Sequence, residues 1–296
     1  MMSTADSRLL KHHLLRAAIL TGFAVYIIYL VRTGSLTLYI APRMAIYVKF
    51  SAMGLYATAI YQLFKAFQLW RGTGPIEDCD CDHVPSPSVT KNTLIYGLFI
   101  LPIALGFLLP SSTLGSSLAS KKGMHLSGSD SHLEQPVYAP GQVKTGEELN
   151  ALFPYDETTK ANADYGKKLY IQDVISVPDN NFVETLTTLD LYRSAFIGKT
   201  IEISGFVFRQ EGMDKNQFAV SRFVMNCCSA DSVPYGLLID YPRAAVYKND
   251  AWIKVRGTLK EENFEGKKVS VLQAQQLQFI EEPDSPYVYP NYDFGL

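Results

Sequence analysis

Three apolar segments before residue 110 are the feature that most limits how this chain of 296 residues can fold. The first, Ala17–Val31, lies between Arg16 and Arg32 and contains no charged residue. As a helix it spans about 22 Å, which is short of a hydrocarbon core of about 30 Å. Arginines that snorkel at both ends, and the apolar run after Gly34, add the missing length. We therefore predict a membrane helix over residues 16–40.

A cleaved signal peptide is the competing interpretation of the first segment. No A-x-A cleavage pattern follows it, and a second apolar segment comes at once. That second segment, Met44–Phe64, has Lys49 as its only charge, and the third, Asn92–Pro110, has none. Both are long enough to cross a bilayer as helices. We predict these further spans over residues 44–69 and 92–110.

The second segment also carries a face of small residues. Ser51, Gly54, Ala57 and Thr58 recur at helical spacing within it. Small side chains allow helix backbones to approach closely in membranes. The sequence leaves open whether this face contacts another helix of the same chain or a helix of a partner.

The basic residues near the three segments predict the orientation in the membrane, because cytoplasmic flanks carry an excess of Lys and Arg. Six lie on the side of the N-terminus and four on the opposite side. The six are Arg8, Lys11, Arg16, Lys65, Arg71 and Lys91, and the four are Arg32, Arg43, Lys121 and Lys122. We predict a cytoplasmic N-terminus, so that three spans place the C-terminal domain outside the cytoplasmic membrane.

The composition changes after the third segment. Residues 111–165 are rich in Ser, Gly, Asp and Pro and have no sustained apolar period, so we predict a flexible linker. A helix capped by Asp179 or Asn180 and ended by Gly198 follows. Five β-prone runs separated by turn residues come next, at residues 200–209, 217–226, 235–241, 251–259 and 269–280. We predict an all-β or α+β domain over 166–296, as a five-stranded barrel of the OB-fold type, with a β-sandwich as the alternative.

Two adjacent cysteines, Cys227 and Cys228, directly follow the second β-prone run. Neighbouring Cα atoms are about 3.8 Å apart across a trans peptide, whereas disulfides need roughly 4.4 to 6.8 Å, so a bond between them is strained. Two interpretations remain open. Either one thiol packs in the core while the other faces outward, or a turn brings both thiols and Asp231 together as ligands for zinc or Cu(I).

A second group of donors lies in the loop 72–91, where Cys79, Cys81 and His83 alternate with acidic residues. Sulfur, nitrogen and carboxylate donors suit transient capture of a divalent metal, although the spacing is not that of a C-x-x-C pair. A solvated acidic loop with incidental thiols is the alternative.

Catalytic patterns are absent: no histidine follows residue 132, so no Ser-His or Cys-His pair can form within the β domain alone. We do not expect an enzyme.

The order of these features resembles one family over nearly the whole chain. Its most specific blocks are GFVFR at 205–209 and RFVMNCCSAD at 222–231, together with YIAPRM at 39–44 between the first two spans. The chain resembles the YcgQ-type permease subunits. The resemblance implies a multi-pass subunit in the cell membrane, a larger YcgR-type permease as its partner, and a role in zinc homeostasis. Many members have a His-rich loop before the third span, whereas this chain has only His83 there.

Two functions therefore compete. In the first, the chain is a permease subunit whose spans contact lipid and the partner. Its extracytoplasmic barrel then presents Cys227, Cys228 and Asp231, with Arg222 as an electrostatic neighbour. In the second, it is a structural or interaction membrane protein that transports nothing, and its β domain binds a partner or a small ligand. Nucleic acid is not expected as a partner, because 27 basic and 29 acidic residues nearly balance.

Overall fold

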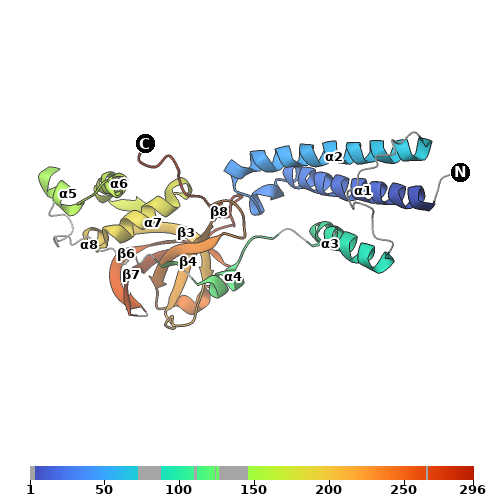
Figure 1. The fold of residues 1–296 in the computed structure, drawn as a ribbon. Helices are drawn as coiled ribbons and strands as arrows, with labels where there is room; N and C mark the ends of the chain where they lie inside the picture. Colours follow the sequence, from blue (N-terminus) through green and yellow to red (C-terminus); the bar gives the residue numbers. More distant parts are fainter. Residues whose placement is uncertain (1–3, 73–87, 110–111, 124, 127–145, 265) are drawn as a thin grey trace. The chain divides into compact units, whose positions relative to one another are not determined.

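The chain forms two units, Met1–Ser112 and Thr113–Leu296 (Figure 1). The computed structural model describes residues 4–72, 88–109, 112–123, 125–126, 146–264 and 266–296. In the first unit, the described residues contain the helices α1 (Thr4–Arg32), α2 (Ala45–Arg71) and α3 (Val89–Leu108). Two 3-10 turns, η1 (Ser35–Leu38) and η2 (Pro42–Met44), connect α1 to α2.

The boundaries of α1 differ from the predicted span 16–40 at both ends. The helix begins twelve residues earlier and stops at Arg32. Gly34 has a φ of 74°, in the left-handed region that favours glycine and commonly ends helices. The hydroxyl of Thr33 also donates to the carbonyl of Tyr29 at 3.0 Å, which satisfies a carbonyl of the last turn. The apolar run after Gly34 therefore forms a 3-10 turn and does not extend the helix.

Helices α1 and α2 pack along each other through alanines (Figure 1). Ala52, Ala59 and Ala66 recur every seven residues on α2 and are all buried. Ala17 and Ala24 show the same spacing on α1 and are also buried. A seven-residue repeat keeps one helix face in contact with its neighbour, and alanine permits a close approach.

The small-residue face proposed for α2 is a different one, and it stays uncovered within the first unit. Ser51, Gly54, Ala57 and Thr58 are all exposed, and a Cβ added at Gly54 would meet no atom within 4 Å. Of the two alternatives left open by the sequence, contact of this face with a helix of the same unit is not seen among the described residues. The alanines one position away, at a strict heptad spacing, take that role.

By length and composition, two of the described helices can cross a membrane, at Ser7–Arg32 within α1 and at Val89–Leu108. Helix α2 has 27 residues but carries Lys49, Lys65 and Arg71, and it is not one of them. The structure therefore shows two candidate apolar helices in the first unit. The predicted count of three spans is not confirmed by this criterion.

The predicted linker 111–165 is wrong over its described parts. It contributes α4 (Ser116–Lys122), β1 (His125–Leu126), α5 (Gly146–Leu152) and the first half of α6 (Lys160–Tyr170) to the second unit. Leu152, Phe153 and Ala163 are buried in the main hydrophobic core of that unit. A few apolar residues at helical spacing suffice when the rest of the same unit covers them, although the average composition of the segment does not reveal them.

A substitution at Phe153 tests whether this segment belongs to the core of the second unit. Its side chain is fully buried and stacks edge-on against Tyr192 at 5.0 Å between ring centroids. Replacing Phe153 with Leu should lower the free energy of unfolding by about 1 kcal/mol, because packing and an aromatic pair are lost. Tyr155→Leu, at a position that is 56% exposed, should change it little. Denaturant unfolding of both variants provides the comparison, and equal stabilities would mean that this segment is not part of the core.

Helices cover one side of the strands in the second unit (Figure 1). After β2 (Val174–Ser176) and η3 (Asp179–Asn181) come α7 (Phe182–Leu191) and the short α8 (Arg193–Phe196). Phe182, Leu186 and Leu189 lie on one face of α7 and are buried in the core. The predicted helix is confirmed in position, but it is interrupted at Tyr192 between α7 and α8, and Gly198 follows α8 with a φ of 85°.

The N-cap of α7 differs from the prediction. Asn181 occupies the N-cap position and makes no side-chain cap bond. Asp179, one of the two predicted caps, instead accepts a hydrogen bond from the Arg222 guanidinium at 2.9 Å. Asp179 therefore pairs with Arg222, far along the chain, and does not cap α7.

All five predicted strands are confirmed, and they belong to one mixed eight-stranded sheet. They are β3 (Thr200–Phe208), β4 (Gln217–Val224), β5 (Val233–Asp240), β6 (Trp252–Phe264) and β7 (Lys267–Phe279), with η4 (Ala244–Val246) between β5 and β6. Their pairings form a closed circuit, β3–β4–β5–β7–β6–β3, in which only β5 and β7 are parallel. The short β1, β2 and β8 (Tyr287–Val288) pair with β5, β3 and β4.

Two glycines permit the close approach of strands within this circuit. Gly205 on β3 and Gly236 on β5 both face the backbone near Ser221 of β4. An added Cβ at either position would clash with a β4 carbonyl oxygen. Glycine within a strand commonly marks such a tight corner. The pairing of β4 with β5 ends at Val224 and Val233, and the loop between these residues carries the two adjacent cysteines.

Candidate metal centre

The two adjacent cysteines lie in the loop that connects β4 to β5. Met225, the first residue after β4, is buried, and its N–H donates to the carbonyl of Val288 in β8 at 3.0 Å. The chain then leaves the sheet, so that Cys227 is exposed and Cys228 is half-buried. The interpretation in which one thiol fills the core is therefore wrong, since neither side chain is in the core.

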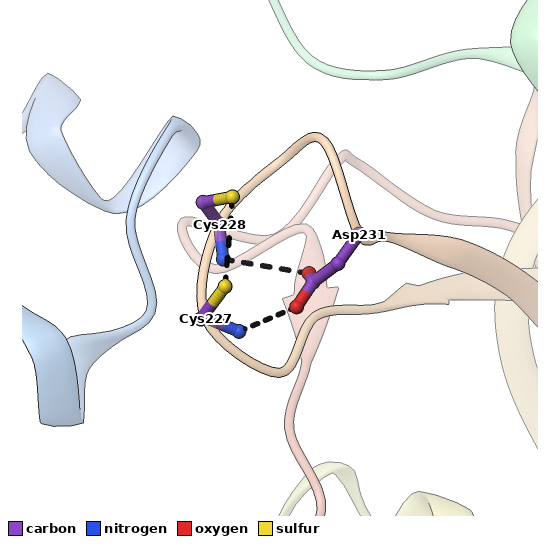
Figure 2. Close-up of side chains that lie close together, drawn as sticks. All are labelled: Cys227, Cys228 and Asp231. Atoms are coloured by element: carbon purple, nitrogen blue, oxygen red, sulfur yellow. Dashed lines mark hydrogen bonds between the residues drawn. The ribbon is translucent and has the colours of Figure 1, made fainter.

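The carboxylate of Asp231 organises this loop (Figure 2). It accepts a hydrogen bond from the N–H of Cys227 at 2.8 Å, and weaker ones from Asn226 at 3.3 Å and Cys228 at 3.4 Å. The N–H of Asp231 in turn donates to the carbonyl of Cys228 at 3.1 Å. Partial burial acts to raise the pKa of Asp231, but these N–H donors and the thiol of Cys227 outweigh it and hold the pKa below its ordinary value.

The two thiols point toward each other and are not equivalent. The Sγ of Cys227 donates to the Sγ of Cys228 across 3.6 Å (Figure 2). Hydrogen bonds to Asp231 and Cys228 stabilise the protonated form of Cys227 and raise its pKa to about 11. The N–H of Ala230 and the thiol of Cys227 stabilise the thiolate of Cys228, which lowers its pKa. Cys228 is therefore the first of the pair to become a thiolate as pH rises.

This donor set fits a thiophilic metal ion. Among the described residues, Cys227, Cys228 and Asp231 form one group whose ligand atoms lie within 4.8 Å of one another. Two thiolates at 2.3 Å from a tetrahedral zinc are about 3.8 Å apart. The observed separation of 3.6 Å between the sulfurs is close to that value. The predicted ligands Cys79, Cys81 and His83 lie outside the described residues.

Two residues that the sequence did not single out hold the loop in place. Lys122, at the end of α4, donates from its ammonium group to the carbonyls of Ser232 at 2.5 Å and Ala230 at 3.1 Å. The hydroxyl of Tyr292, near the C-terminus, donates to the side chain of Asn226 at 3.3 Å. Both lie far from the cysteines along the chain, and no local pattern signals their role.

Arg222 does not act as the predicted electrostatic neighbour of the thiols. It is 2% exposed and donates to the carboxylate of Asp179 and to the carbonyls of Pro286 at 2.9 Å and Ser285 at 2.6 Å. Its guanidinium also lies over the ring of Trp252, 5.1 Å from the centroid. Arg222 thus fixes the C-terminal segment to the sheet, and it contributes to no pKa shift of either thiol.

The fold and site together define a protein with apolar N-terminal helices and a β-rich domain that carries a dithiol loop. Two family models match such a chain: the DUF1980 N-terminal domain covers residues 15–125 and the DUF1980 C-terminal domain residues 152–290. The UPF0703 protein YcgQ of Bacillus subtilis is 31% identical over 290 residues, which are 94% of this chain and 99% of that protein. The chain belongs to this YcgQ family, so the predicted family is confirmed.

A second relative, from Streptococcus mutans, is 27% identical over 201 residues, covering 65% of this chain and 72% of that protein. Its name describes it as a two-component membrane permease complex subunit. No solved structure matches the chain.

Proposed function

We propose that this protein is a subunit of a two-component permease in the cell membrane. The observation that carries the proposal is the relationship to the S. mutans protein of that name, in a chain that itself has two helices able to cross a membrane. The larger component is expected to be a polytopic permease of the YcgR type. The role of this subunit is non-enzymatic: it positions a metal-handling domain beside the permease.

In this proposal α2 is a third span between α1 and α3. Its 27 residues measure about 40 Å, longer than a hydrocarbon core of about 30 Å. Lys49, Lys65 and Arg71 lie near its two ends, where long side chains reach the interface. The alanine contacts to α1 favour insertion of the two helices together. Three spans with a cytoplasmic N-terminus then leave the second unit outside the membrane.

The second unit in this proposal is a barrel of the OB-fold type. The circuit β3–β4–β5–β7–β6–β3 supports it, because five strands that close through one parallel pair give the strand order of that barrel. Residues of all five strands contribute to one core, which α7 covers with Phe182, Leu186 and Leu189. The cysteine loop connects the second and third strands of this barrel.

Zinc is the metal we propose for the cysteine loop. Zinc accepts thiolate and carboxylate ligands in tetrahedral geometry, and the chain offers two sulfurs and one carboxylate here. Three protein ligands leave a fourth position for water or a partner's side chain. An open position suits a site that passes metal on, whereas structural zinc sites are closed by four protein ligands.

Three residues of the exposed small-residue face of α2, Ser51, Gly54 and Thr58, form the proposed docking surface for the permease. Ala57, the fourth residue of that face, lines a groove between α1 and α2 and is not part of this surface. The hydroxyls of Ser51 and Thr58 donate to carbonyls of their own helix at 2.8 Å and 3.0 Å, so a partner helix meets no unsatisfied donor there. Gly54 has open space around its Cα. A partner helix can therefore approach the backbone closely at this point.

Co-purification tests this arrangement. The full chain with an affinity tag, expressed with its YcgR-type partner, should retain that partner in mild detergent. Gly54→Leu should reduce the retained partner at least about ten-fold, since a bulky side chain at a close helix crossing costs more than 1.4 kcal/mol. Gly97→Leu in α3 is the matched control, because Gly97 also has open space around it. Quantitative immunoblotting gives the ratio.

Loss of the partner in both glycine variants, or in neither, would remove this face from the proposal. The side of the second unit is tested separately by adding protease to intact cells, where an extracytoplasmic domain is cut. If the full chain stays in the soluble fraction after ultracentrifugation without detergent, the permease proposal itself is wrong.

A further inference from the structure

We propose that a groove between α1 and α2 binds one anionic phospholipid, with its phosphate held by Arg32 and Lys49 and an acyl chain along the two helices. This inference rests on the proposed insertion of both helices in the membrane. It assigns a ligand to a cavity that the partner surface and the metal centre do not use.

The groove lies on one face of the helix pair, is partly open, and has a volume of about 470 Å³. Its walls are almost entirely apolar, with Ile27, Ile28 and Val31 from α1 and Met53, Tyr56 and Ile60 from α2. The α2 residues recur at spacings of three and four, so they form one continuous stripe. Such a wall suits a hydrocarbon chain.

The length of the groove matches one leaflet of a bilayer. It extends along α2 from Lys49 to Ile60, eleven residues apart, which is about 16 Å at 1.5 Å per residue. Half of a hydrocarbon core is about 15 Å. The charged end of the groove therefore lies at the depth of lipid headgroups, while Ile60 reaches the bilayer centre.

The two basic residues that line the groove favour a lipid headgroup with a net negative charge. Arg32 is the last residue of α1 and Lys49 lies in the second turn of α2, so both cations are at the same end of the groove. Among the described residues of the first unit, Asp6 is the single acidic one, and it lies near the opposite end of α1. Two cations beside an apolar channel without a carboxylate are complementary to a lipid phosphate with a net negative charge.

A partner helix is the competing occupant, and the observations favour lipid. A helix seated here would have to bring carboxylates to neutralise Arg32 and Lys49 at the membrane surface. Lipid phosphate is already present at that depth. The surface proposed for the partner, around Gly54, lies on a different part of α2 and does not line the groove.

Native mass spectrometry of the full-length protein tests the inference. The protein in neutral detergent is mixed with equal amounts of phosphatidylglycerol and phosphatidylcholine, and bound lipids are counted. We expect one phosphatidylglycerol to be retained in preference to phosphatidylcholine. Arg32→Gln and Lys49→Gln should each weaken that preference about five-fold, from about 1 kcal/mol per basic residue. Ala57→Phe, which fills the groove at an exposed position, should remove retention of the lipid.

Arg71→Gln is the matched control, since Arg71 ends α2 at the opposite side and does not line the groove. It should retain phosphatidylglycerol like the unmodified chain. Helix content by circular dichroism and a single peak in gel filtration show that each variant is folded.

Equal retention of the two lipids, or an unchanged preference in the Arg32 and Lys49 variants, overturns the inference. Loss of the permease partner in Ala57→Phe, with lipid retained, also overturns it and assigns the groove to the partner. A chain that fractionates with membranes yet fails these tests refutes only the lipid site, whereas a chain absent from membranes refutes the proposed function.

Discussion

Replacing both Cys227 and Cys228 with serine is expected to weaken zinc binding by the full-length protein at least about 100-fold. Two of the three ligand atoms of the proposed centre are lost, and serine hydroxyls are poor ligands for zinc at neutral pH. The measurement is a competition titration with a zinc chelator of known affinity, in detergent and under reducing conditions. Serine preserves the size of the side chains, so the loop held by Asp231 should persist.

The chain provides a matched control, Cys79→Ser with Cys81→Ser, which removes the other two thiols. This variant should keep the high-affinity site. If the control variant loses zinc and the Cys227/Cys228 variant does not, the metal site is in the loop 72–91. If neither binds less zinc, the cysteines of the chain have no metal function.

The pH dependence of zinc binding follows from the two thiols. Zinc binds thiolates, and the pKa of Cys227 is raised to about 11, so this thiol is protonated in the free protein at neutral pH. Zinc must displace its proton. Affinity should therefore rise as pH increases, with about a ten-fold gain per unit for each proton released, and fall as pH decreases. Equal affinity at pH 6.5 and pH 8.5 would contradict a thiolate site.

Replacing Arg222 with Met is expected to lower the free energy of unfolding by about 3 kcal/mol. The guanidinium is 2% exposed and supports three partners, the Asp179 carboxylate and the carbonyls of Ser285 and Pro286. Methionine fills similar space but leaves both carbonyls without this donor, and hydrogen bonds from a charged group contribute about 1.5 to 3 kcal/mol each. Denaturant unfolding of the full chain, followed by tryptophan fluorescence, reports the change because Trp252 lies beside Arg222.

Two further variants show whether the buried guanidinium causes the loss of stability in Arg222→Met. Arg222→Lys keeps the charge but cannot reach all partners with a planar fork, so it should recover part of the stability. Arg243→Met removes an exposed arginine whose hydrogen bond goes to the Tyr241 hydroxyl, and it should change stability by less than about 0.5 kcal/mol. A loss equal to that of Arg243→Met would show that the buried guanidinium contributes nothing to folding.

The strands of the second unit were predictable because each is encoded locally. Alternating residues such as Ile201 and Ile203 on β3, and turn residues such as Gly212 and Gly266, define each run without knowledge of its partners. The pairing of β5 with β7 is different. It joins segments more than thirty residues apart, and no local pattern fixes its parallel register.

The helices α4, α5 and α6, within and next to the expected linker, were missed for the opposite reason. Phe153 and Ala163 are isolated apolar residues in a polar stretch. Their burial depends on core residues from distant parts of the chain, which a local pattern does not reveal. A similar limit applies to the candidate metal centre. The sequence indicated Cys227, Cys228 and Asp231 as one group, but not Lys122, whose contacts to Ala230 and Ser232 cross more than one hundred residues.

The second unit can complete its fold only after β8 has been synthesised, because β8 pairs with β4. Arg222 and Pro286, which meet beside this pair, are 64 residues apart in the sequence. At about 5 to 20 residues per second, the ribosome needs about 3 to 13 s to make that interval. Until then the β4 edge and the Arg222 guanidinium lack their carbonyl partners. A nascent chain therefore exposes an open strand edge at β4 during that interval, and a chaperone that protects this protein during synthesis must act within it.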